Sequence, residues 1–443
     1  MAGTSDSDDL LWVGPGTVMG EFMRQFWMPA ALSSEVEADG APMRLMLLGE
    51  KLMAFRDSSG RVGVMDHRCP HRCASLVIGR NEEDGIRCVY HGWKYDVTGA
   101  CVDMPSVPEH QQFKDKVRAK AYRVAERAGL IWVYMGSRAD VPPLPDFEVT
   151  LLPEGPANIS ILQRACNWLQ GLEGDIDTSH LGFLHAGSVG GDDLGPEHPM
   201  YHAVVNRAPE YKVAQAPWGT TYGAYRHDPD GRISWRIANF LFPFWTQTPN
   251  TEFGKRVVAN AWVPMDDTHT MMIKVTGGAG EVGNFAQWPM KNGHKMAGTD
   301  PLEYLPNDTG WYGRWRAAAN PGNDWLIDRA AQERNEIYTG IDGITLQDQA
   351  ITESMGAITD HAFEHLGPSD QMIARTRRAL LLAARAFAET GALPPGASDP
   401  SVYWSARSGT FHADAATDWQ DAYRDNLKTA IRWYPPAGKE AAE

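Results

Sequence analysis

Short apolar runs separated by turn residues dominate the first third of the chain. The segment 43–66, MRLMLLGEKLMAFRDSSGRVGVMD, breaks such runs at Gly and at Asp-Ser-Ser-Gly. This pattern is typical of antiparallel strands joined by tight turns, and it continues through GLIWVYMG, which ends at Gly136. Before the strands, the pattern predicts a short apolar helix from about Met19 to Phe26, ended by Pro29. We therefore expect an N-terminal antiparallel β domain.

Beyond residue 147 the pattern mixes helices and strands. The Pro-rich segment DVPPLPDF at 140–147 is typical of a linker. A helical stretch near 163–185 precedes the strand-like runs RISWRIANFLFPFWTQTP, RVVANAWVPM and HTMMIKVTG, and helices follow from about 325 to 390. A sheet with helices packed to one side makes an α+β domain. The predicted division is an N-terminal helical segment at 1–30, a β domain at 31–147 and an α+β domain at 148–443.

Composition and charge narrow the function classes. A chain of 443 residues is long enough for two or three domains. It has no run of 18 apolar residues, and its acidic start, MAGTSDSDDL, is unlike a signal peptide. We therefore expect a cytoplasmic protein without membrane contact. The net charge of −15 argues against a nucleic-acid partner, because neutralising phosphates needs a basic face.

Two Cys/His pairs carry the first candidate chemistry. RCPHRCASL contains Cys69-x-His71, and CVYHGWKYD contains Cys88-x2-His91. The five cysteines are few, odd in number and mostly clustered, which in a reducing cytosol favours metal binding over disulfides. The four side chains suit either a tetrahedral zinc site, as in a zinc-stabilised binding module, or a two-iron cluster with thiolates on one iron and imidazoles on the other.

The two pairs resemble the C-x-H and C-x2-H halves of a Rieske [2Fe-2S] domain, including the HGWKYD of ring-hydroxylating oxygenases. The resemblance implies that Cys69 and Cys88 bind the inner iron and that His71 and His91 bind the outer iron. On this interpretation, two further cysteines are spare thiols packed near the cluster, Cys73 and Cys101.

The stretch NWLQGLEGDIDTSHLGFLH carries a second metal motif. On a regular helix Glu173, Asp177 and His180 would share one face. His185 would lie off that face unless a π-type turn or a helix end near Gly182 realigned it. Two histidines and an acid suit a ferrous iron with open positions for O2. The alternative is a helix whose polar face meets solvent.

The third iron ligand must come from elsewhere in the chain. GITLQDQAITESMGAITDHAFEHLGPSD offers Asp348, Glu353 and Asp360. This segment is similar to the Q-D-x-A-x2-E-S-M-G stretch of the phthalate-dioxygenase-like branch of Rieske oxygenases, which implies Asp348 as the ligand. The alternative is that Asp348 caps a helix beginning there. The N-terminal VGPGTVMGEFMRQFWMPA resembles the same branch.

The resemblance implies a terminal oxygenase whose Rieske cluster passes electrons to a mononuclear Fe(II), which activates O2 against an aromatic substrate. It implies a helix-grip catalytic domain and a homotrimer or dimer of trimers in which one subunit's cluster serves the neighbour's iron. Asp177 would then lie between subunits and accept hydrogen bonds from His180 and from the neighbour's His91.

The electron donor is expected to be a separate protein. Gly278-x-Gly280-x2-Gly283 follows an apparent strand, but the polar, Pro-containing sequence after it is unlike the helix of a dinucleotide site. With no flavin or nicotinamide site evident, the resemblance implies a separate NADH-dependent reductase, acting directly or through a ferredoxin. A pure Rieske electron carrier is the alternative, but it would leave the second metal motif without a purpose.

The branch commonly takes aromatic carboxylates, which need a cation in an otherwise apolar pocket. Three arginines are candidates, although each could instead lie on the surface or span the sheet: Arg207, Arg226 and Arg236. The aromatic-rich run at 240–249 could wall the pocket or form a core strand. Ring dihydroxylation and O-demethylation of a methoxylated acid use the same metals, and the sequence does not separate them.

Overall fold

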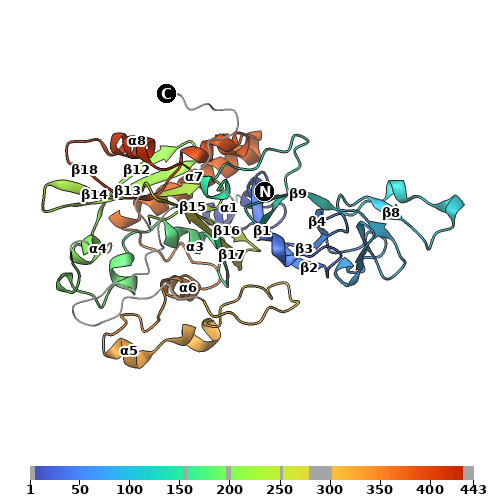
Figure 1. The fold of residues 1–443 in the computed structure, drawn as a ribbon, viewed down its shortest axis with the longest axis horizontal. Helices are drawn as coiled ribbons and strands as arrows, with labels where there is room; N and C mark the ends of the chain where they lie inside the picture. Colours follow the sequence, from blue (N-terminus) through green and yellow to red (C-terminus); the bar gives the residue numbers. More distant parts are fainter. Residues whose placement is uncertain (1–4, 153–156, 196–200, 250–252, 279–301, 433–443) are drawn as a thin grey trace.

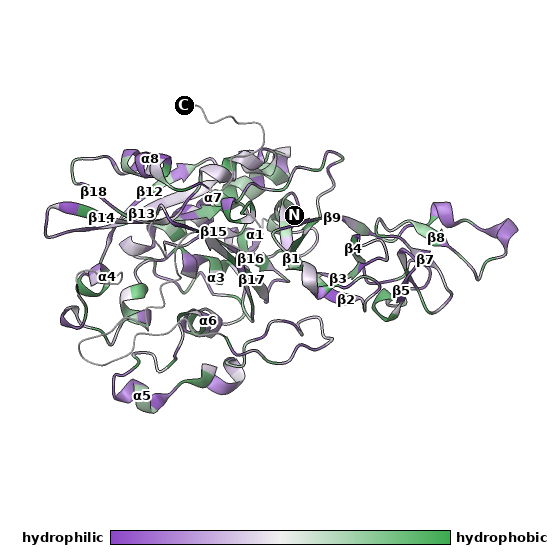
Figure 2. Cartoon of the chain, viewed as in Figure 1, coloured by the Kyte–Doolittle hydropathy of each residue, from purple (hydrophilic) through white to green (hydrophobic). Residues whose placement is uncertain are grey.

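The computed structural model describes residues 5–152, 157–195, 201–249, 253–278 and 302–432. Figure 1 shows a small lobe of blue and cyan strands extending to one side of a larger body built on one sheet and its helices. Figure 2 shows hydrophilic residues at the tip of the small lobe, beyond β8. No helix among the described residues is long and apolar enough to span a membrane.

The small lobe is built from two antiparallel sheets, as the alternating pattern predicted. The first is six-stranded in the order β1-β10-β9-β4-β3-β2 and the second four-stranded in the order β5-β6-β7-β8. The strands are β1 (Trp27–Leu32), β2 (Met43–Leu47), β3 (Glu50–Arg56), β4 (Val62–Asp66), β5 (Arg80–Glu82), β6 (Gly85–Arg87), β7 (Lys94–Tyr95), β8 (Cys101–Asp103), β9 (Ala121–Arg127) and β10 (Leu130–Tyr134).

The N-terminal helices differ from the prediction. Helix α1 spans Asp6–Leu11 and α2 spans Val18–Met23. Pro29 does not end a helix, because the chain has already entered β1 by Trp27. The register of β1 against β10 shifts between Pro29 and Ala31, an irregularity that accommodates a residue without a backbone N–H.

The large lobe is an eight-stranded antiparallel sheet ordered β11-β17-β16-β15-β14-β13-β12, with β18 paired to β14. Its strands are β11 (Asn158–Arg164), β12 (Glu210–Ala216), β13 (Gly219–His227), β14 (Arg232–Leu241), β15 (Trp245–Gln247), β16 (Arg256–Pro264), β17 (Thr270–Gly278) and β18 (Gly409–Asp414). The remaining helices are α3 (Trp168–Asp175), α4 (Tyr201–Val205), α5 (Arg329–Glu333), α6 (Ile344–Ser354), α7 (Gln371–Thr390) and α8 (Trp419–Thr429). The α+β prediction is confirmed.

The long helix α7 packs against the sheet of the large lobe and against the two N-terminal helices. Its buried residues recur at helical spacing and face β13, where the hydroxyl oxygens of Thr376 and Thr220 lie 2.8 Å apart. Helices α1 and α2 also pack on α7. The N-terminal segment therefore contacts the large lobe, while the domain boundaries at residues 30 and 147 stay predictions.

Helix α3 lies directly against the sheet at Gly171. A Cβ atom at Gly171 would stand 2.1 Å from Cζ3 of Trp262 on β16, so a larger residue would push the helix away. This close approach brings the end of α3 over β15 and β16. Of the glycine motif, Gly278 ends β17, whereas Gly280 and Gly283 lie outside the described residues.

Candidate metal centres

Two turns in the small lobe present the Cys/His pairs. In the first, Cys69 N–H donates to Ala74 O at 2.8 Å and Cys73 N–H to Cys69 O at 2.9 Å. In the second, Cys88 N–H donates to Trp93 O at 2.8 Å and the N–H of the following glycine donates back to Cys88 O. The two turns are closed by the same two kinds of backbone hydrogen bond, and each turn carries one cysteine and one histidine of the motif.

The four side chains form an inner and an outer layer. Cys69 and Cys88 are only 1% and 3% exposed, and the rings of His71 and His91 lie 4.4 Å apart. The ring of Trp93 stacks on His71 at 4.3 Å. Nδ1 of His91 is buried and has no hydrogen-bond partner among the described residues, so it is available to a metal. Buried thiols with imidazoles on one side fit a Rieske cluster.

Side chains around the thiols refine this picture. The Tyr95 hydroxyl lies 3.4 Å from Cys69 Sγ, a contact that sequence reasoning missed although Tyr95 stands within HGWKYD. Burial raises the pKa of the Cys69 thiol. Cys101 is buried, as predicted, and its Sγ lies 3.5 Å from Asp103 O. Cys73 is exposed, so the prediction of a packed thiol there was wrong, because the turn directs it outward.

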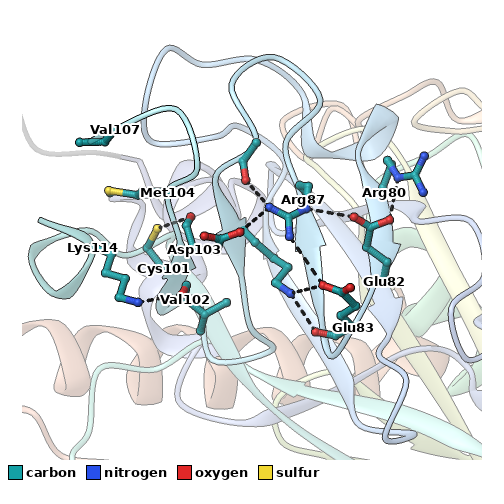
Figure 3. A network of polar contacts seen from close by, with 12 residues as sticks. Arg80, Glu82, Glu83, Arg87, Cys101, Val102, Asp103, Met104, Val107 and Lys114 are labelled. Atoms are coloured by element: carbon teal, nitrogen blue, oxygen red, sulfur yellow. Dashed lines mark hydrogen bonds and ion pairs between the residues drawn. The ribbon is translucent and has the colours of Figure 1, made fainter. Parts of the chain in front are cut away.

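A network of ion pairs and hydrogen bonds stabilises the turn that carries Cys88 and His91. Arg87, next to Cys88, donates to Glu82 at 3.0 Å, to Asp103 at 2.7 Å and to the carbonyl of Gly92 at 2.7 Å. Figure 3 shows this guanidinium between the two carboxylates. Because Gly92 directly follows His91, the network holds the strand ends that carry the cluster turn.

In the large lobe, a π-type turn aligns the two histidines. Helix α3 ends at Asp175, and a π-helix at Leu181–His185 follows after a short irregular segment. Nε2 of His180 consequently lies 3.2 Å from Nε2 of His185, as expected for a π-type turn at this point. The predicted shared face with Glu173 was wrong, because the helix breaks; Glu173 instead forms a bidentate ion pair with Arg377, at 2.6 Å on both oxygens.

Asp348 completes this cluster. Its Oδ1 lies 3.2 Å from Nε2 of His185 and 3.8 Å from Nε2 of His180. Within the described ranges these are the only three such side chains whose ligand atoms all lie within 4.8 Å of one another. Asp348 sits inside α6, whose N-cap is Gly343, so the alternative of a helix cap was wrong. The three side chains fit the donor set of a mononuclear iron.

The two other acids are used elsewhere. Glu353 accepts from Ala165 N–H at 2.9 Å and from Trp325 Nε1–H at 2.6 Å, which ties α6 to the end of β11. Asp360 accepts from the backbone N–H of Ala362 at 3.0 Å in an exposed turn. Neither joins the histidines.

The local charges favour an ionised carboxylate beside the imidazoles. Burial raises the pKa of Asp348, but the neighbouring His185 and His180 outweigh it, so the pKa lies below its ordinary value. For Asp177, too, burial raises the pKa, but His180 outweighs this effect and the pKa lies below its ordinary value. Nδ1 of His180 lies 3.4 Å from Asp177 Oδ2. His180 thus presents Nδ1 to Asp177 and Nε2 to Asp348 and His185.

Hydroxyls and a half-buried acid, Asp175, tie the histidine segment to the sheet. Thr178 Oγ1 lies 2.5 Å from the Tyr222 hydroxyl on β13. Ser179 Oγ lies 2.6 Å from the Tyr211 hydroxyl on β12. Asp175 Oδ2 accepts three hydrogen bonds, from Thr246 Oγ1 at 2.6 Å and from Asn260 Nδ2 and Trp262 Nε1 at 2.8 Å. Sequence reasoning missed these partners, since they lie 30 to 90 residues away.

The three candidate arginines differ in their partners. Arg207 donates to Val189 O at 2.8 Å and lies over the Phe183 ring at 5.1 Å. Arg226 donates through Nε to Asn206 O at 2.7 Å, and burial lowers its pKa to about 10. Arg236 is half-buried, its Nε is buried without a partner, and no carboxylate of the described chain forms an ion pair with it.

Arg236 also faces the histidine segment. It pairs with Ala224 across β14 and β13, two residues from the pair that Tyr222 makes with Ala238. Residues two apart on a strand point to the same side of a sheet, so Arg236 and Tyr222 share a face. Since Tyr222 reaches Thr178, this is the face toward His180. Burial lowers the pKa of Arg236.

Comparisons with known proteins agree with this geometry. The sequence matches the Rieske [2Fe-2S] domain family over residues 26–114 and the family described as LigXa C-terminal domain like over residues 133–430. It is 49% identical to the 3-chlorobenzoate-3,4-dioxygenase oxygenase subunit of Comamonas testosteroni, over 98% of this chain and 100% of the relative. It is 35% identical to the phthalate 4,5-dioxygenase oxygenase subunit of Pseudomonas putida, over 91% and 90%.

Solved structures agree on the fold. The NdmA QL mutant of Pseudomonas putida CBB5 with caffeine aligns with a TM-score of 0.55 at 19% identity, covering 90% of this chain and 99% of that one. The Rieske match settles the choice between zinc and a two-iron cluster in favour of the cluster. The chain therefore belongs to the Rieske-type oxygenases, as an oxygenase subunit that combines a [2Fe-2S] domain with a mononuclear-iron catalytic domain.

Proposed function

We propose that this oxygenase uses O2 and electrons from a separate NADH-dependent reductase, received directly or through a ferredoxin, to dihydroxylate the ring of a benzoate-type aromatic acid. The observation that carries the proposal is the joint presence of the two Cys/His turns and of His180, His185 and Asp348 within 4.8 Å. The similarity to the 3-chlorobenzoate-3,4-dioxygenase oxygenase subunit supports ring dihydroxylation as the reaction.

The proposed roles follow the two sites. Cys69 and Cys88 hold the inner iron of the cluster, and the imidazoles of His71 and His91 hold the outer iron. His180, His185 and Asp348 hold the mononuclear iron. When bound, the cluster supplies electrons and the mononuclear iron activates O2. Adding both oxygen atoms to a ring takes two electrons and two protons for each turnover.

The substrate carboxylate is proposed to bind Arg236. This guanidinium faces the side of the sheet that carries Tyr222, and it has no carboxylate partner within the described part of the chain. An anionic ligand would supply the missing charge and hydrogen-bond acceptors. Arg207 and Arg226 are weaker candidates, because both already donate to backbone carbonyls.

Assembly and location are also proposed. We propose that the subunit works in the cytoplasm as a homotrimer or a dimer of trimers, in which the cluster of one chain faces the iron of the next. The neighbour's His91 and the chain's own His180 then share Asp177. The lowered pKa of Asp177 supports this role, because an ionised carboxylate can accept from both imidazoles.

Product analysis tests the reaction. The holoenzyme is supplied with a surrogate reductase, NADH and O2 and is given 3-chlorobenzoate, phthalate or a methoxybenzoate. We expect a cis-diol from a benzoate-type acid with both oxygen atoms derived from 18O2. Formaldehyde from the methoxybenzoate, with no diol from any of the acids, would show an O-demethylase and contradict the proposal.

Replacing Arg236 by Gln should weaken binding of the acid more than it slows the chemistry. Losing a charge-assisted contact of about 1.5–3 kcal/mol would raise KM for benzoate roughly 10- to 100-fold. Iron content and the cluster spectrum should stay unchanged. The matched control is Arg226→Gln, which removes a neighbouring guanidinium already bonded to Asn206. If both variants raise KM equally, Arg236 is not the specific anchor.

A further inference from the structure

A buried glutamine stands behind one of the two iron histidines. Gln347 is 1% exposed on α6, directly before Asp348. Its Oε1 lies 2.7 Å from Nδ1 of His185. Its Nε2 donates to Ile341 O at 2.8 Å and to Thr339 Oγ1 at 3.0 Å. All of these partners belong to this chain, so the contacts do not depend on a neighbouring subunit.

Only one orientation of the Gln347 side-chain amide is consistent with these hydrogen bonds. A backbone carbonyl can only accept, so the atom facing Ile341 O must be the NH2 group of Gln347. The Thr339 hydroxyl can donate its hydrogen to Ile341 O at 3.2 Å while it accepts a hydrogen bond from Gln347 Nε2. Oε1 of Gln347 therefore faces His185 as an acceptor, and Nδ1 of His185 must carry the proton.

We infer that Gln347 is a positioning residue that selects the tautomer and ring orientation of His185 needed for binding iron. With the proton held on Nδ1, the lone pair is on Nε2, which lies 3.2 Å from both His180 Nε2 and Asp348 Oδ1. Partners behind a metal-binding histidine fix it in this way and commonly change metal affinity 10- to 100-fold when removed. The inference rests on the proposed role of His185 as an iron ligand.

The two histidines are thereby held by different chemistry. His180 faces the carboxylate of Asp177, whereas His185 faces a neutral amide. A neutral acceptor suits this position, because His185 already faces a carboxylate on its other side, with Asp348 Oδ1 3.2 Å from its Nε2. Gln347 also links His185 to the loop before α6, through Thr339 and Ile341. The geometry of the iron site therefore depends on that loop as well as on the π-helix.

Iron release provides the test. In the purified holoenzyme, the rate at which mononuclear iron is lost to a ferrous chelator is measured together with Tm. We expect Gln347→Leu to lose iron at least about 10-fold faster than the unchanged enzyme. The matched control is Gln349→Leu on the same helix, since Gln349 is 2% exposed and bonds Glu353 and Ala319 O rather than a histidine. Equal iron loss from the two variants would overturn the inference.

A conservative variant shows whether the hydrogen bond that Gln347 accepts from His185 matters, or only the packing of its side chain. Gln347→Glu keeps an oxygen for Nδ1 of His185 but loses both donors, so it should release iron more slowly than Gln347→Leu. Release as fast as in Gln347→Leu would overturn the acceptor role. His185→Ala tests the proposed ligand set separately. If His185→Ala retains its mononuclear iron, His185 is not a ligand and the proposed iron site is wrong. If His185→Ala loses iron while Gln347→Leu releases it no faster than the unchanged enzyme, only the positioning role of Gln347 is refuted.

Discussion

Replacing Asp348 by Ala should leave the enzyme without mononuclear iron and lower turnover at least about 100-fold, with the visible spectrum of the cluster unchanged. Asp348 supplies the only carboxylate of the three-residue cluster found in the described chain. Its removal leaves two imidazoles, a donor set without the carboxylate charge that holds a ferrous ion. The iron-to-protein ratio, the cluster spectrum and the product yield are measured on one preparation.

Glu353→Ala is the control for this experiment. Glu353 lies five residues further along the sequence, on the same helix. Its replacement removes three structural hydrogen bonds, donated by Ala165, Trp325 and Gln349. This variant should have a lower Tm but keep its mononuclear iron. Iron loss in Glu353→Ala with iron retained in Asp348→Ala would show that the wrong carboxylate was chosen.

The two Cys/His pairs and the two histidines of the second motif could be found in the sequence because the residues of each pair lie close together in the chain. Cys69 and His71 share one turn, and Cys88 and His91 share another, so the spacing alone fixes each pair. The five-residue separation of His180 and His185 does not suit a regular helix, and this mismatch predicted either a π-type turn or a helix end near Gly182. The structure has the π-helix, at Leu181–His185. Asp348 required the resemblance, because nothing local joins it to the histidines.

The parts that could not be predicted depend on contacts between distant segments. The site of the helix break after Asp175 follows from three donors on β15 and β16, which the local sequence does not reveal. For this reason Glu173 was placed on the wrong face. Gln347 stands beside Asp348 in the sequence, but its role emerges only when α6 and the π-helix are brought together.

Local propensity also failed where tertiary packing decides the outcome. Pro29 resembles a helix stop, yet it lies in β1, because pairing with β10 outweighs the missing N–H at an irregular position. The arginines showed the same limit. The sequence offers three candidate substrate-binding arginines and no basis for choosing among Arg207, Arg226 and Arg236. Only their hydrogen-bond partners in the structure distinguish them.

Replacing Asp177 by Asn should keep both metals and the assembly but lower turnover by about 100-fold. Asp177 Oδ1 accepts from Ser179 N–H at 2.7 Å, and Oδ2 lies 3.4 Å from His180 Nδ1. The carboxylate can also accept from a second imidazole, which we propose is His91 of the neighbouring subunit. Asn keeps the shape but offers one acceptor and one donor, so one imidazole N–H loses its partner.

Rapid mixing of the reduced enzyme with substrate and O2 tests this role directly. In Asp177→Asn, the cluster should be oxidised much more slowly and the product yield should fall, while the iron content and the mass of the oligomer stay the same. The control is Glu173→Gln, which alters an acid on the same segment that bonds Arg377 and none of the metal-site residues. Glu173→Gln should lower Tm but leave cluster oxidation fast. Unchanged oxidation in Asp177→Asn would mean that electrons reach the iron without this carboxylate, and Asp177 would then serve only to orient His180 within its own chain.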